Sequence, residues 1–93
     1  MRIEWLPEAA RNLTAQLEWI AERGPDAALD VGDAVHAAVA RLADHPATGR
    51  PGLAAATRQL VVIGTAYIVV FRIERTAVLV LRVLHGAQRW PPA

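Results

Sequence analysis

The feature that most constrains this chain is its C-terminal third, residues 57–90, which is strongly apolar and rich in β-branched side chains. Valine and isoleucine favour extended strands, because their branched side chains pack well on a pleated surface and are restricted in a helix. Gly64-Thr65 and the polar triplet at 74–76 interrupt the apolar runs and indicate turns. The pattern therefore predicts three strands, over about 57–63, 66–74 and 77–84, joined as an antiparallel meander.

Both faces of this predicted meander are largely apolar. In the middle strand, one face carries Tyr67, Val69, Phe71 and Ile73, and the other carries Ile68, Val70 and Arg72. In the last strand, Val78, Val80 and Arg82 alternate with Leu79, Leu81 and Val83. We expect helices to cover one face and a component outside this chain to cover the other.

The first half of the chain supplies a short strand and two helices. Residues 1–5 alternate apolar and charged side chains, which predicts a strand that joins the sheet. Pro7 begins a helix that ends near Arg23, and Pro25 begins a second helix that His45-Pro46 closes. The first helix has an apolar stripe of Ala10, Leu13, Leu17 and Ile20, and the second has one of Ala28, Val31, Val35, Val39 and Leu42.

The predicted architecture is one α+β domain over residues 1–93, in the order β-α-α-β-β-β. The short link between the helices favours a helical hairpin, packed on one face of a small, mainly antiparallel sheet. Residues 47–56 are rich in Gly and Pro and are expected to form a loop from which Arg50 projects. The place of the first strand in the sheet stays open.

Composition limits the function classes. The chain has no cysteine, so disulfides and thiolate metal sites are excluded, and its ten basic residues are all arginine. The net charge is +1, with basic and acidic residues interspersed, which argues against a general nucleic-acid binder. No apolar run reaches the length of a membrane span and no targeting signal begins the chain, so we expect no membrane contact and a cytoplasmic protein.

No catalytic or metal-binding motif of high specificity is present. His36, His45 and His85 lie on different elements without ligand spacing, so we expect no metal and no cofactor. His36 is expected on a solvated helix face, and His45, before a proline, is expected to end a helix. The informative cluster lies at the end of the last strand and consists of Arg82, His85, Gln88, Arg89 and Trp90.

Two interpretations of that cluster stay open. In one, the side chains gather on the rim of the sheet, where Arg and His stabilise charge or exchange protons and Trp90 stacks on a partner. In the other, Trp90 folds back over the sheet end, Arg89 pairs with a carboxylate and His85 bonds a carbonyl. Arg50, Arg58 and Arg72 carry the same ambiguity, and Arg72 would neighbour Arg82 if their strands pair in register.

Taken end to end, the chain resembles the ParE/RelE superfamily of type II toxins. The matching segments are MRIEW, AARNL with WIAERGP, AVARLADHPATGRPG, TRQLVV, YIVVFRI and VLRVLHGAQRWP, all in the family's order. The resemblance is closer to the ParE branch and its plasmid-stabilisation relatives than to RelE. TRQL resembles the branch's more usual TREL, with Gln59 in place of a carboxylate.

The resemblance implies a growth-inhibiting toxin that a cognate antitoxin, ParD-like or similar, neutralises in a hetero-oligomer. ParE-like toxins bind DNA gyrase and are not hydrolases, and RelE-like toxins cut messenger RNA on the ribosome. The absence of lysine and the low net charge favour the ParE-like activity. If the chain were instead a nuclease, the candidate catalytic residues would be Arg58, Arg82, His85 and Arg89.

The implied contacts with the target or antitoxin fall on Arg50, Arg58, Arg72, Arg82, His85, Gln88, Arg89 and Trp90. The antitoxin is expected to lay a C-terminal segment over the helical hairpin and the sheet, with carboxylates that meet arginines. His36 would then be either solvated or antitoxin-facing.

Overall fold

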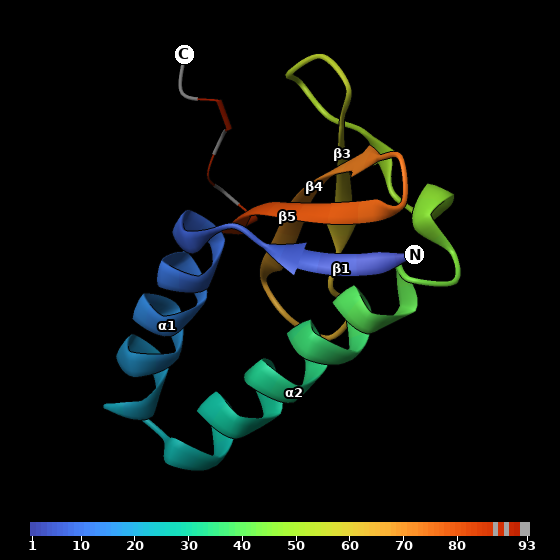
Figure 1. Ribbon diagram of the computed structural model, residues 1–93. Helices are drawn as coiled ribbons and strands as arrows, with labels where there is room; N and C mark the ends of the chain where they lie inside the picture. Colours follow the sequence, from blue (N-terminus) through green and yellow to red (C-terminus); the bar gives the residue numbers. More distant parts are fainter. Residues whose placement is uncertain (87, 89, 92–93) are drawn as a thin grey trace.

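The computed structural model describes residues 1–86, 88 and 90–91, and it shows the predicted α+β fold (Figure 1). The elements follow in the order β1 (Arg2–Trp5), α1 (Pro7–Ala21), α2 (Pro25–Arg41), a 3₁₀ turn (Pro46–Thr48), β2 (Arg50–Pro51), β3 (Thr57–Val61), β4 (Tyr67–Glu74) and β5 (Ala77–His85). The two helices form a hairpin on one face of the sheet, which we call the helical face; the opposite face is the open face. Among the described residues, no helix is long and apolar enough to cross a membrane.

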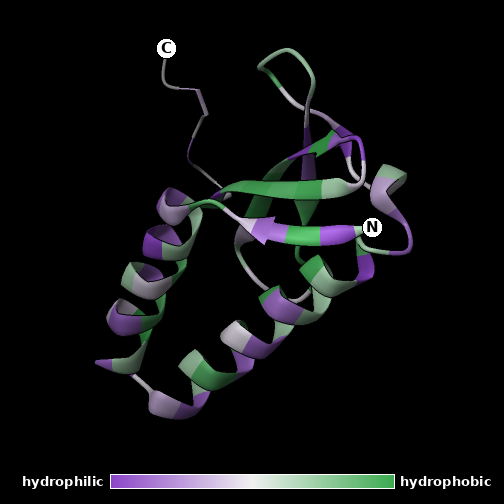
Figure 2. Cartoon of the chain, in the orientation of Figure 1, coloured by the Kyte–Doolittle hydropathy of each residue, from purple (hydrophilic) through white to green (hydrophobic). Residues whose placement is uncertain are grey.

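The helical hairpin packs through small residues and alternating apolar positions. Ala9 and Leu13 are buried on α1, so the stripe begins at Ala9, and the prediction of Ala10 is wrong. Ala9 and Ala10 lie four and three residues before Leu13, so both fit a helical stripe. The orientation of α1 on the sheet buries Ala9 and leaves Ala10 exposed. On α2, Gly32 is buried, and a side chain there would meet Leu17 at 3.4 Å. The helices thus turn apolar sides inward and polar sides outward (Figure 2).

The second helix ends earlier than predicted. The α-helical span of α2 stops at Arg41, and a turn follows in which the His45 N–H still donates to the Arg41 carbonyl at 3.0 Å. Leu42 caps this end and is buried against Phe71 and Val78. His45-Pro46 therefore marks the end of the turn after the helix rather than the end of the helix.

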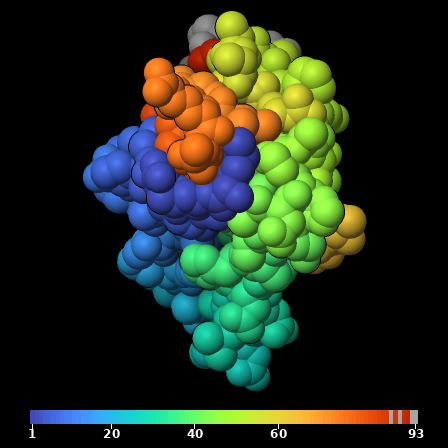
Figure 3. Space-filling view, turned by 45° about the vertical axis from the view of Figure 1, so that its right-hand side comes forward, coloured from blue at the N-terminus to red at the C-terminus, as the bar shows by residue number. Residues whose placement is uncertain are grey.

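The sheet has the strand order β1-β5-β4-β3-β2. β1 pairs in parallel with β5, with Ile3 opposite Val78, and the other neighbours are antiparallel. In Figure 3 the N-terminal residues accordingly lie beside the β4–β5 hairpin. The predicted meander is confirmed, although β3 ends at Val61, because the next residues form the turn to β4. β2 was expected as loop, since two residues in a Gly- and Pro-rich segment give no strand pattern.

A β-bulge changes which side chains of β5 share a face. Val70 pairs with Arg82, but Phe71 pairs with Val80, so Leu81 is an extra residue on β5. Strict alternation placed Val83 with Leu81 and Arg82 with Val80, and that prediction is wrong. Beyond the bulge, Val83 joins the core on the helical face and Arg82 moves to the open face. The predicted grouping in β4 is unaffected.

The open face has its own small core. Val70, Ala77, Leu79 and Leu81 form a buried cluster, against which Leu6, Leu84 and Trp90 pack. Val70 is 0% exposed and Leu81 is 6% exposed in the single chain. We expected a component outside the chain to cover this face, and for this cluster the expectation is wrong. The chain covers it with its own side chains, Trp90 among them.

Candidate functional site

A row of four residues crosses the open face of the sheet. Arg82 on β5 pairs with Val70 on β4, Val70 pairs with Gln59 on β3, and Gln59 pairs with Arg50 on β2. We call these four residues the arginine row. Neighbouring strands lie about 4.8 Å apart, so the backbones of the two arginines are separated by about 14 Å. The row therefore presents two cations at its ends, with apolar and amide groups between them.

A groove of about 430 Å³ lies beside the Arg50 and Gln59 end of this row. The segment Arg50–Leu53 lines one side, and Gly86, Gln88 and Trp90 line the other. Gln59 and Ile68 also contribute to its lining. The groove is thus built by parts of the chain that are far apart in the sequence and that pairing in the sheet brings together.

The two arginines of the row are held differently. Arg82 Nη1 donates to the Leu81 carbonyl at 2.6 Å, and the guanidinium carbon lies 5.5 Å from the centre of the Trp90 ring. This is within the range of a cation–π contact, which fixes the guanidinium beside the indole. Arg50 is exposed, and its Nη2 donates to Gln59 Oε1 at 3.5 Å, the limit for a hydrogen bond. Arg50 therefore has the weaker contacts of the two cations.

Trp90 lies on the open face and does not pack against Trp5. Trp5 belongs to the helical face, where its ring lies 5.5 Å from the ring of His36 on α2. Trp90 packs on the open-face cluster beside Leu84. The structure thus places Trp90 both as a cover for the sheet and as one wall of the groove.

Arg58 and Arg72 have structural partners. Arg58 lies on the helical face and donates to the carbonyls of Ala47, at 3.0 Å, and Gly49, which ties down the segment before β2. Arg72 lies on the open face and forms an ion pair with Glu74 at 2.7 Å. The β4–β5 register pairs Arg72 with Leu79 and Arg82 with Val70, so the two arginines are not cross-strand partners.

His85 lies on the helical side of the sheet, away from Arg82. Its ring packs edge-on to Tyr67 with the ring centres 5.8 Å apart. Both line a second hollow, of about 640 Å³, together with Gln16 and Trp19 from α1. Gln88 borders both hollows, and its Oε1 accepts the His85 N–H at 2.8 Å. The end of β5 therefore divides the predicted cluster between two faces. Arg89 lies outside the described residues.

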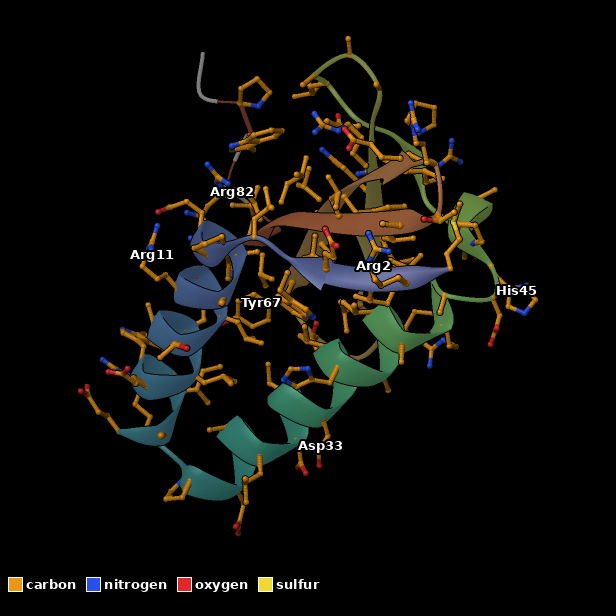
Figure 4. All side chains as sticks on the ribbon, viewed as in Figure 1. Arg2, Arg11, Asp33, His45, Tyr67 and Arg82 are labelled. Carbon is orange, nitrogen blue, oxygen red and sulfur yellow. The ribbon has the colours of Figure 1, made fainter. Side chains whose placement is uncertain are left out.

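The remaining histidines lie far from the row. His36 is exposed on α2 and His45 is exposed after it, at the edge of the molecule (Figure 4). Among the described residues, no three His, Cys, Asp or Glu side chains gather as metal ligands would.

Charge is segregated between the two halves of the chain. Residues 1–45 hold four arginines and eight acidic residues, a net charge of −4. Residues 46–93 hold six arginines and one glutamate, a net charge of +5. The interpretation of charges as interspersed is therefore wrong: the helical hairpin is acidic and the strands after it are basic. Counting charge by element rather than over the whole chain would have revealed this field.

The pKa of Glu8 responds to Arg11 and, more weakly, to the charge of Arg82, at one end of the arginine row. Hydrogen bonding and charge attraction from Arg11, and more weakly the charge of Arg82, hold the pKa of Glu8 below its usual value. Arg11 Nε donates to Glu8 Oε1 at 3.0 Å, and Figure 4 shows Arg11 and Arg82 on the same side of the molecule. Glu8 is exposed, so this contact is screened by solvent.

The pKa of Glu8 is expected to rise in both Arg11→Gln and Arg82→Gln, and by more in Arg11→Gln. Because the folded-state pKa is depressed, any stability from this contact is present above the unfolded pKa and is lost as pH falls through the folded pKa. Titration of the Glu8 side-chain carboxyl by NMR measures both shifts, and Arg41→Gln on α2 serves as a control. An unchanged pKa in Arg82→Gln would contradict the placement of Arg82 beside α1.

Comparison with known proteins gives a consistent result. A family model for the ParE toxin of the type II toxin–antitoxin system parDE matches residues 3–90. "Putative toxin Y4kP" of Sinorhizobium fredii is 42% identical over 90 residues, which cover 97% of this chain and 93% of that protein. "Toxin RelE1" of Caulobacter vibrioides is 31% identical over 83 residues, which cover 87% and 88%.

A solved structure shares the fold. A chain of the "Chromosomal ParDE TA system from P. aeruginosa" superposes with a TM-score of 0.81 at 24% identity, covering 91% of this chain and 95% of that one. The hairpin on a five-stranded sheet is thus an arrangement already seen in a solved structure.

Proposed function

The chain belongs to the ParE family of toxins from type II toxin–antitoxin systems, and from that premise we propose that it inhibits growth by binding DNA gyrase until a cognate antitoxin neutralises it. The expected antitoxin is ParD-like, and the two proteins would form a hetero-oligomer. The toxin would act by binding a protein rather than by hydrolysis.

The observation that carries the protein-binding mechanism is the separation of His85 from Arg82. General acid–base cleavage of RNA needs a proton-transfer group and a charge-stabilising cation at the same phosphate. Here His85 packs against Tyr67 on the helical side, whereas Arg82 and Arg50 lie on the open face. The sheet therefore separates His85 from Arg82 and Arg50. Arg58 shares the helical face with His85, but its guanidinium is bonded to the carbonyls of Ala47 and Gly49, so a binding function is favoured for each face.

Antitoxin binding is supported by apolar surface on the hairpin. A hollow of about 490 Å³ between the helices is lined by Leu17, Ala21, Ala28 and Leu29. Leu29 is 66% exposed, and Trp19 on the neighbouring side of α1 is 56% exposed. Large apolar side chains left exposed in this way typically mark a protein interface. An amphipathic antitoxin segment that covered them would remove this surface from water.

A RelE-like nuclease is the second candidate function. The relative named RelE1 favours it, and so does the basic charge of residues 46–93, which suits a polyanion. Arg82, Arg58 and His85 would then be the candidate catalytic residues within the described chain, together with Arg89.

Induction of the chain in a bacterial host, with separate assays for the DNA-damage response and for messenger-RNA cleavage, distinguishes the two functions. We expect growth arrest with a DNA-damage response, and trapping of cleaved DNA when purified gyrase is mixed with the chain. His85→Ala should keep this activity within about threefold, because His85 lies off the open face. Co-expression of a cognate antitoxin should restore growth.

Ribosome-dependent cleavage of messenger RNA that His85→Ala abolishes would overturn the gyrase proposal in favour of the nuclease. Growth arrest that the co-expressed antitoxin does not relieve would contradict the proposed partner.

A further inference from the structure

We propose that the arginine row is a docking site for an extended acidic segment of the antitoxin. Two carboxylates, at positions i and i+4 of that segment, pair with Arg50 and Arg82, and an apolar side chain at i+2 enters the groove beside the row. The identity of the occupant rests on the proposed function, which makes an antitoxin the partner of this chain.

The spacing of the row fits an extended chain. A strand rises about 3.4 Å per residue and points residues i, i+2 and i+4 to the same side, so i and i+4 lie about 14 Å apart. This matches the three strand spacings between Arg50 and Arg82, also about 14 Å. In a helix the same two positions lie only about 6 Å apart. A segment that lies across the strands in extended form therefore meets both arginines at once.

The groove supplies the central contact. Ile68, two residues along β4 from Val70, and the Trp90 ring offer apolar surface beside the middle of the row, within reach of the i+2 side chain. Gln59 and Gln88 line the same groove, and their amide NH₂ groups can donate to backbone carbonyls of a bound segment. A base could stack on the Trp90 ring, but a nucleic acid would be expected to need a more continuous line of cations along its phosphates than these two arginines provide. The chemistry of the groove therefore favours a peptide.

The charges of the open face select an acidic peptide. Two other open-face arginines are already neutralised, Arg2 by Glu4 at 2.8 Å and Arg72 by Glu74 at 2.7 Å. Within the described part of the chain, no carboxylate lies at ion-pair distance from Arg50 or Arg82. Glu8 does feel the charge of Arg82, but its carboxylate is bonded to Arg11. The row thus lacks its own counter-ions.

A short capped peptide tests the proposal without knowledge of the antitoxin. It carries Glu, Leu and Glu at alternating positions with Thr between them, and it is titrated into the ¹⁵N-labelled chain by NMR. We expect saturable shifts at Gln59, Ile68 and the Trp90 indole. Arg50→Gln and Arg82→Gln should each weaken binding about two- to fivefold, the range of an exposed ion pair, and added salt should weaken it further. Arg41→Gln makes the same charge change on α2 and should leave the affinity unchanged.

A second peptide, with the last Glu moved one position so that it faces away, should bind as weakly as the Arg82→Gln variant binds the first. Shifts confined to the helices, equal binding of both peptides, or affinity unchanged by Arg50→Gln would overturn the proposal. So would shifts at the row with a short DNA duplex but not with the peptide. None of these results bears on neutralisation by co-expressed antitoxin, so the docking site can fail while the proposed function stands.

Discussion

Replacement of Phe71 by alanine is expected to lower the free energy of unfolding by about 3–5 kcal/mol, the range for truncation of a buried aromatic side chain. Phe71 is 0% exposed and forms a cluster with Leu42 and Val78, which joins the end of α2 to the centre of the sheet. The backbone of Gly49 also lies against the Phe71 ring, since a side chain there would approach it to 2.8 Å. Loss of the ring therefore leaves a cavity that the surrounding backbone cannot fill.

Urea unfolding followed by circular dichroism measures this change, with Ile63→Ala as the control. Ile63 is 88% exposed in the turn before β4, so its truncation should change the free energy of unfolding by less than about 0.5 kcal/mol. If Phe71→Ala cost as little as Ile63→Ala, the packing of α2 and the β2 segment onto β4 would be wrong.

Most of the fold could be predicted from the sequence, because helix starts and hairpin turns are marked by local residue patterns. Pro7 and Pro25 mark both helix starts, and Gly64 marks a hairpin turn that the structure confirms with a φ of +84°. The parallel pairing of β1 with β5 has no such signal, because it joins residues more than seventy positions apart. The bulge at Leu81 also has no sequence signal, because the apolar run of β5 is continuous at the point where the alternation changes.

The candidate site could be predicted only in part from the sequence, because strand pairing between distant residues forms it. The sequence identified the arginines and Trp90, but it grouped Arg82 with His85 because they are three positions apart. The bulge places Arg82 on the open face, and the end of the strand places His85 on the side that faces α1. Arg50 and Gln59 become neighbours through β2, which has no sequence pattern. The arginine row is thus a product of strand pairing and could not be predicted from spacing along the chain.

Deletion of residues 86–93 is expected to abolish growth inhibition, while the antitoxin loses its contact with the groove but still binds through the helical hairpin. The deletion removes Trp90 and Gln88, which form one side of the groove, and it removes the contact between the Arg82 guanidinium and the indole. Tryptophan and arginine dominate the binding energy of protein interfaces, so their loss should affect target binding strongly. Viable counts after induction should return to within about tenfold of an empty-vector control.

Trp90 also covers the sheet, so loss of function must be separated from loss of structure. Without the indole, Leu81 and Leu84 become more exposed, and we expect a loss of about 1–3 kcal/mol in the free energy of unfolding, which leaves the domain folded. Trp90→Phe keeps an apolar ring over the cluster, so it should be more stable than Trp90→Ala and retain more growth inhibition. A thermal melt by circular dichroism checks that each variant is folded.

If the deleted chain were folded and still arrested growth, the C-terminal segment would not contact the target. If it were unfolded, Arg50→Gln in the full-length chain would test the same face, because Arg50 is exposed and carries no part of the core.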